Sequence, residues 1–174
     1  MMHREECMRL PKRKPNRLPN FDYSTPGAYF ITICTKDKEC ILGQIVGASI
    51  ARPPYIELSY CGQIVEQTIR DIPRYYPTIS VDHYVVMPNH IHLLLQINTD
   101  MDGRPMVAPT ISTVVQQLKG AVTKQIGHSI WQKLFHDHVI RGEQDYLKIW
   151  EYIENNPARW EEDCFYLQQK KQEG

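Results

Sequence analysis

Two histidines separated by one residue lie inside the apolar stretch from Tyr84 to Gln96, YVVMPNHIHLLLQ. Because side chains alternate along a β-strand, His90 and His92 would project from one face about 6–7 Å apart, with Ile91 on the other face. Two imidazoles held on one rigid face form half of a metal site. Histidines also serve as ordinary packing residues, so the spacing alone leaves a metal site and a structural role both open.

A predicted helix from Glu143 to Asn156, ended by Pro157, carries a second pair of polar groups. Four residues at helical spacing predict its buried stripe: Tyr146, Ile149, Trp150 and Ile153. Tyr152 lies off that stripe and one turn before Asn156, so these two side chains can point at a common target. Asn156 directly before Pro157 is also consistent with a simple helix terminator.

Other apolar patterns predict the elements that would position these groups. Strands are expected at 29–35, 55–58, 79–87, 90–97 and 139–140, and further helices at 59–72 and 110–126. The turn-forming pair Pro88-Asn89 joins two of the strands into a β-hairpin. This order predicts an α+β fold, most simply a ferredoxin-like antiparallel sheet with helices packed on one face.

The length of 174 residues predicts a single folded domain. We expect a basic N-terminal arm at residues 1–20, the domain at 21–160 and a polar C-terminal tail at 161–174. The five cysteines are scattered without a C-x-x-C pair, which indicates neither a zinc knuckle nor a disulfide framework. With no N-terminal signal segment and no apolar run of membrane-spanning length, the sequence predicts a cytoplasmic protein.

The formal net charge is zero, which argues against a protein that coats nucleic acid through overall positive charge. The distribution is uneven: basic residues outnumber acidic ones in 1–40 and 104–141, and the reverse holds in 142–174. Both a solvated surface and local phosphate contact are consistent with such an imbalance.

Four segments, in this order and spacing, resemble the REP-associated tyrosine transposases, which are single-tyrosine members of the HUH superfamily. They are DYSTPGAYFITICT, VVMPNHIHLLL, FHDHVIR and YLKIWEYIENNPARW, and the resemblance spans roughly residues 17–166. In this family the paired histidines bind a divalent metal, and a polar residue four positions after the tyrosine completes the site. The resemblance therefore implies His90, His92 and Asn156 as ligands of a divalent metal ion, and Tyr152 as the nucleophile. We expect Mg²⁺ or Mn²⁺, but zinc, cobalt or nickel would bind two such nitrogens at least as well, and the sequence leaves the choice of metal open.

Two rival assignments concern similar residues nearby. Tyr146 is the other candidate nucleophile, but its place on the apolar stripe, with Trp150 four residues later, favours a core role. His136 and His138 form a second H-x-H pair. They align with a different segment of the family, and we assign them to DNA contact or to structure.

The resemblance implies a metal-dependent endonuclease and strand transferase that acts on single-stranded or hairpin-bearing palindromic DNA. The reaction would pass through a covalent bond from Tyr152 to a 5′ phosphate. We expect the protein to act as a monomer rather than a homodimer, and to associate with the nucleoid when DNA is bound. Candidate phosphate contacts are Lys12, Arg13, Lys14, Arg17, Lys119, Lys124 and Arg141. The acidic end, Glu161 to Asp163, argues against tight DNA affinity.

Two other functions stay open at this point. One is a domesticated protein that binds hairpin nucleic acid without cutting it, although the intact Tyr, His and Asn positions weigh against this. The other is a metallohydrolase that acts through an activated water. That mechanism needs a general base near the histidines, and their sequence neighbourhood offers no obvious Glu.

Overall fold

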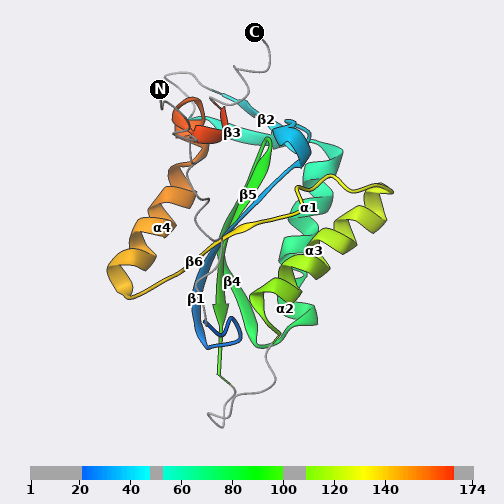
Figure 1. The fold of residues 1–174 in the computed structure, drawn as a ribbon. Coiled ribbons are helices and arrows are strands. Elements are labelled where there is room, and N and C mark those ends of the chain that lie inside the picture. The colour runs from blue at the N-terminus through cyan, green and yellow to red at the C-terminus, as the bar shows by residue number, and fades with distance from the viewer. Residues whose placement is uncertain (1–20, 48–52, 100–108, 167–174) are drawn as a thin grey trace, which may run out of the picture.

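A four-stranded antiparallel sheet forms the centre of the molecule, with strand order β4-β5-β1-β6 (Figure 1). In the computed structural model, which describes residues 21–47, 53–99 and 109–166, the strands are β1 (Gly27–Cys34), β4 (Ile79–Met87), β5 (His90–Ile97) and β6 (His136–Val139). A second, two-stranded antiparallel sheet pairs β2 (Gly43–Val46) with β3 (Tyr55–Leu58). The predicted α+β class with an antiparallel sheet is confirmed.

The helices lie on both sides of the large sheet. They are α1 (Tyr60–Arg70), α2 (Ile72–Tyr75), α3 (Ile111–Ile126) and α4 (Glu143–Asn155), with short 3-10 helices η1 (Lys36–Lys38) and η2 (Pro157–Glu162). Figure 1 shows α1, α2 and α3 on one side of the sheet and α4 on the other. The expectation of helices on one face therefore holds for the first three helices, and α4 adds a layer to the opposite face. None of the helices in the described ranges is long and apolar enough to cross a membrane.

Strand β5 runs through the middle of the sheet and is buried on both faces. Its odd-numbered residues, Ile91, Leu93, Leu95 and Ile97, are fully buried in the main apolar core. That core also contains Val114, Leu118 and Val122 of α3. Since side chains alternate along a strand, His90, His92 and Leu94 face the other way, toward α4. The same alternation that buries the isoleucines and leucines thus places both histidines on one face.

Polar residues cap the starts of two helices. Ser59 caps α1, because its hydroxyl accepts a hydrogen bond from the Gly62 amide at 3.1 Å. Thr110 caps α3 in the same way, through the Thr113 amide at 3.2 Å. Helix α3 ends at Gly127, whose φ of 92° lies in the left-handed region that glycine adopts without strain.

The predicted β-hairpin has the expected bounds, with Met87 paired to His90 across the turn. Two strand predictions were wrong. Strand β2 was missed, and β6 covers 136–139 instead of 139–140. As a result, His136 and His138 belong to an edge strand of the sheet, paired with Thr32 and Phe30 of β1.

The predicted buried stripe of α4 is only partly correct. Ile153 is buried, but Trp150 is exposed and Tyr146 is only half-buried. Helix α4 packs on polar groups of β4: the Tyr146 hydroxyl donates to Asp82 Oδ2 at 2.9 Å, and the Trp150 ring stacks on His83 at 4.4 Å. Helical spacing identified the residues that face the sheet, but these contacts leave part of each ring in solvent.

Candidate metal centre and nucleophile

His90 and His92 converge on a single point beneath α4. Both side chains are buried, at 0% and 1% exposed, and their Nε2 atoms lie 3.1 Å apart. Neighbouring strands fix their positions, because His90 pairs with Met87 and Cys34 while His92 pairs with Val85 and Thr32. The sequence prediction that the two rings share one face therefore holds, and the rings tilt toward each other at their outer nitrogens.

The tautomer of His90 follows from its partner Asn89. The Asn89 amide donates through Nδ2 to the Lys38 carbonyl at 3.1 Å, so its Oδ1 faces His90 Nδ1 at 2.8 Å. An amide oxygen only accepts, and Nδ1 must therefore carry the proton. The lone pair of His90 then lies on Nε2 and is directed toward His92, as a metal ligand requires.

His92 is held from behind by a residue of the adjacent strand. Its Nδ1 lies 2.9 Å from the hydroxyl of Thr32, which is itself buried. The ring also stacks on Phe30 at 5.1 Å. Thr32 thus fixes the direction of Nε2, which points toward His90 and the end of α4.

Burial keeps both imidazoles uncharged at neutral pH. Desolvation lowers the pKa of His90 well below its ordinary value, with the neighbouring His92 as the next cause. Desolvation also lowers the pKa of His92, to about 3. Neutral imidazole is the form that binds metals, so neither ring has to lose a proton to act as a ligand at pH 7.

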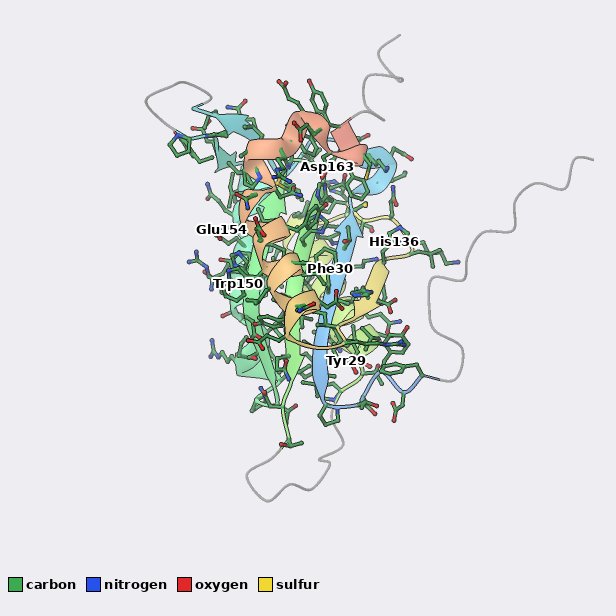
Figure 2. All side chains as sticks on the ribbon, turned by 90° about the vertical axis from the view of Figure 1, so that its left-hand side faces the viewer. Tyr29, Phe30, His136, Trp150, Glu154 and Asp163 are labelled. Carbon is green, nitrogen blue, oxygen red and sulfur yellow. The ribbon has the colours of Figure 1, made fainter. Side chains whose placement is uncertain are left out.

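Tyr152 of α4 reaches the same point from above the sheet. Its hydroxyl lies 3.3 Å from His92 Nε2, and its ring packs edge-on against Phe30 at 6.0 Å. The side chain is 43% exposed, and it lines a cavity of about 260 Å³ together with Asn156, Arg159 and Asp163. Figure 2 shows α4 in front of the sheet, with Phe30 beside the helix and Asp163 beyond its end. The hydroxyl is therefore accessible to a substrate and adjacent to the histidines.

The Tyr152 phenol is fully protonated at neutral pH. Burial, and then the negative charge of Asp163, raise its pKa to about 12, although a hydrogen bond with Asn156 opposes the increase. Tyr146, the rival, contacts Asp82 on β4 and not the histidine pair. The structure thus brings Tyr152, and not Tyr146, to the two imidazoles.

Asn156 follows α4 directly and is buried beside Tyr152 at 3% exposed. Its Nδ2 donates to Asp163 Oδ2 at 3.3 Å, and its buried Oδ1 has no hydrogen-bond partner among the described residues. An unpaired buried oxygen costs about 1–3 kcal/mol unless another group satisfies it. A cation in front of the histidines is one such group.

Asp163 is a member of the cluster that the sequence analysis missed. One nitrogen from each of His90 and His92 and one carboxylate oxygen of Asp163 lie within 4.8 Å of one another, and all three residues are buried. Two neutral imidazole nitrogens, a carboxylate and the free amide oxygen of Asn156 form a donor set that suits a divalent cation. The described residues therefore contain a possible metal-binding group.

The other predicted site residues lie elsewhere or outside the described ranges. Lys12, Arg13, Lys14 and Arg17 are outside them. Lys119 donates to three backbone carbonyls, those of Gln132, Lys133 and Leu134 at 2.9–3.4 Å, which occupies the donors of its ammonium group. Contact between Lys119 and a phosphate would require these bonds to break. Lys124 and Arg141 are exposed.

The second H-x-H pair lies on β6, away from the strand that carries His90 and His92. His138 Nε2 lies 2.8 Å from Asp145 Oδ2, and the same carboxylate accepts the Arg141 amide at 3.1 Å. These bonds join the start of α4 to the sheet edge. They agree with the structural role that was one of the two roles considered.

The predicted domain boundaries stay a prediction, but part of the predicted tail packs on the site. The Phe165 ring lies 4.4 Å from His90, and the Lys38 ammonium lies 4.5 Å from the same phenyl ring. Sequence patterns gave no signal for these contacts, because residues 161–166 have no apolar periodicity.

The fold and the cluster define a class of protein in which an antiparallel sheet presents paired histidines to a tyrosine-bearing helix. An uncharacterized protein of Haemophilus influenzae is 34% identical over 174 residues, covering 89% of this chain and 93% of the relative. A second protein of that organism, described as a "Putative REP-associated tyrosine transposase", is 24% identical over 147 residues, covering 79% of this chain and 74% of the relative. No protein-family model matches the chain.

A solved structure gives the corresponding comparison of folds. The REP-associated tyrosine transposase bound to a REP hairpin superposes with a TM-score of 0.58 at 23% identity, covering 78% of this chain and 68% of the other. The chain belongs to the family of the first relative, and its resemblance to the REP-associated tyrosine transposases is confirmed in sequence by the second relative and in fold by this structure.

Proposed function

We propose that this chain is a metal-dependent endonuclease and strand transferase for single-stranded DNA, and that it forms a covalent bond between Tyr152 and a 5′ phosphate. The observation that carries the proposal is the Tyr152 hydroxyl, which lies 3.3 Å from one of two facing imidazole nitrogens and is open to a cavity. A nucleophile beside a cation site is the arrangement that phosphoryl transfer needs.

Tyr152 would attack the scissile phosphate from the open side of α4. A bond forms between its phenolic oxygen and phosphorus while the bond from phosphorus to the 3′ oxygen breaks; the phenol loses a proton and the 3′ oxygen gains one. Attack by a second 3′ hydroxyl on the same phosphorus reverses these changes and releases Tyr152. Each exchange replaces one phosphodiester bond with another, so rejoining needs no ATP.

The residues of the chain fit the requirements of such a reaction. His90, His92 and Asn156 would hold the cation, for which we propose Mg²⁺ or Mn²⁺. When bound, this cation stabilises negative charge on the phosphate oxygens as a Lewis acid. Arg159 lines the cavity beside Tyr152 and is exposed, so it can contact the phosphate directly. The nearby positive charge of Lys38, which contributes to lowering the pKa of His90, favours an anionic substrate at this end of the sheet.

The proposed substrate is hairpin-bearing palindromic DNA. This proposal is supported by the solved relative, whose description states that it is bound to a REP hairpin, and by the second curated relative. We propose that the chain acts as a monomer in the cytoplasm and associates with the nucleoid when DNA is bound. The exposed cations Lys124 and Arg141 and the basic arm remain the proposed phosphate contacts.

A covalent-adduct assay tests this function. Purified protein, labelled single-stranded hairpin DNA and Mn²⁺ should give a species that survives denaturation, and Tyr152→Phe should abolish it while hairpin binding is retained. Tyr146→Phe is the matched control, because it removes a phenolic hydroxyl from the same helix. If the adduct persists in Tyr152→Phe but disappears in Tyr146→Phe, the nucleophile is Tyr146 and the proposed assignment is wrong. Hairpin retention with no cleavage under any metal would support a binding protein instead.

A further inference from the structure

Asp163 is a buried carboxylate close to two uncharged imidazoles. It is 9% exposed and lies just after η2, seven residues after Asn156. Its Oδ1 accepts the Phe165 amide at 2.7 Å, and its Oδ2 accepts from the Asn156 side chain at 3.3 Å. These two bonds orient the carboxylate but leave capacity on both oxygens, because an ionised carboxylate offers about four acceptor sites.

The distances around Asp163 are close to those of a cation site. A carboxylate oxygen lies within 4.8 Å of a nitrogen of each histidine, and the two histidine nitrogens are 3.1 Å apart. Ligand bonds of about 2.1 Å in octahedral geometry hold neighbouring ligand atoms about 3 Å apart. The histidine pair already has this spacing, and a carboxylate oxygen within 4.8 Å would have to move by less than about 2 Å to reach it.

Asn156 provides a second, independent observation at the same place. The residue is only 3% exposed, yet within the part of the chain that the structure describes its Oδ1 has no hydrogen-bond partner. Its Nδ2 donates to Asp163, and both residues line the cavity beside Tyr152, so the unpaired oxygen belongs to an amide in direct contact with the cluster. The carboxylate and the amide therefore belong to one hydrogen-bonded group next to the histidines.

We infer that Asp163 supplies the anionic ligand of the metal centre, alongside His90 and His92, and that Asn156 both orients Asp163 and offers its own oxygen. The inference rests on the proposed function, since that function supplies the metal. A fourth ligand of this kind changes the charge of the site, because Asp163 adds one negative charge to the three neutral ligands His90, His92 and Asn156.

Two consequences follow from a carboxylate at this position. Hard cations such as Mn²⁺ and Mg²⁺ prefer oxygen ligands, so Asp163 and Asn156 would balance the nitrogen ligands that favour zinc, cobalt or nickel. In addition, Asp163 follows η2, so a bound cation would join residues 157–166 to β5. Metal binding should then slow amide hydrogen exchange in this segment.

Metal affinity measured without DNA tests the inference. The full chain is stripped with a chelator and titrated with Mn²⁺, with the free ion followed by electron paramagnetic resonance. Asp163→Asn should weaken Mn²⁺ binding about tenfold or more, while the neighbouring exposed Glu162→Gln should change it less than about twofold. Asp163→Ser serves as a second variant if Asp163→Asn does not fold, and amide exchange in residues 157–166 of the unmodified chain gives a readout that needs no variant.

The outcomes separate this inference from the proposed function. If His92→Ala loses Mn²⁺ but Asp163→Asn and Asp163→Ser bind it as tightly as the unmodified chain, Asp163 is not a ligand and the two-histidine site stands. If the unmodified chain binds no Mn²⁺, both ideas fail. Exchange in residues 157–166 that is unchanged by Mn²⁺, together with unchanged affinity, would also overturn the role of Asp163.

Discussion

Replacing Thr32 by Val tests whether the strand next to β5 controls the state of His92. The substitution keeps the shape of the side chain and removes only its hydroxyl, which lies 2.9 Å from His92 Nδ1. Both residues are buried, at 6% and 1% exposed, so water cannot replace the lost partner without opening the structure. His92 Nδ1 would then be buried with no hydrogen bond.

The expected cost follows from that unpaired nitrogen. A buried polar atom that loses its partner costs about 1–3 kcal/mol. For a domain of this size, that corresponds to a fall in melting temperature of about 3–9 °C. Metal affinity should also fall, by about 10- to 100-fold, because the hydroxyl holds the direction and tautomer of the ligand.

Thermal unfolding in chelator and Mn²⁺ titration measure the two effects separately. Thr68→Val is the matched control, since within the described ranges the Thr68 hydroxyl bonds to the Ile64 carbonyl of its own helix, and α1 lies on the side of the sheet opposite α4. Nitrogen-15 spectra of the histidines should show a changed tautomer population for His92 alone. If Thr32→Val matches Thr68→Val in melting temperature and in metal affinity, the argument that Thr32 positions His92 is refuted.

Two further predictions concern stability. Because burial lowers the folded-state pKa of both His90 and His92, the unfolded chain binds more protons below its histidine pKa of about 6.5. The free energy of unfolding of the metal-free protein should therefore fall by up to about 1.4 kcal/mol per histidine for each pH unit below 6.5. Urea unfolding between pH 7.5 and about 5 measures this fall, and His92→Gln should show a smaller dependence of stability on pH. Ile153→Ala should cost about 2–4 kcal/mol because the side chain is 1% exposed, whereas Leu147→Ala, at 57% exposed, should cost less than about 0.5 kcal/mol; equal losses in urea unfolding would contradict the packing of α4.

Local sequence signals were sufficient to predict the elements that carry the histidines. The β-hairpin was predicted to the residue, since two apolar runs flank the turn pair Pro88-Asn89. Helix α3 was predicted at 110–126 from the spacing of its apolar residues, and it spans Ile111–Ile126 with Thr110 as its cap. The shared face of His90 and His92 then follows from strand alternation alone. These features depend on neighbours within a few residues, which a single sequence displays.

Features that depend on distant contacts could not be predicted in the same way. Asp163 lies in an acidic stretch with no periodicity, and only the turn of η2 after Asn156 brings it back to the sheet. The three carbonyls that engage Lys119 come from the segment after α3, so its spacing on the helix suggested an exposed cation instead. The exposure of Trp150 was likewise unpredictable, because the stacking partner His83 lies far away in the sequence.

The distribution of buried polar groups gives the strongest reason to regard this end of the sheet as a functional site. Among the described residues, all buried polar or charged side chains belong to one neighbourhood: Thr32, Thr35, Asn89, His90, His92, Asn156 and Asp163. Hydrogen bonds join Thr35 to Asn89, Asn89 to His90, and His92 to Thr32, and the metal-binding group joins Asp163 to the histidines. A core selected for stability alone would use apolar residues here, since each such group needs a partner to offset its desolvation. The buried Asn156 oxygen, which none of the described residues pairs, belongs to a residue of this same network, where a bound cation would satisfy it.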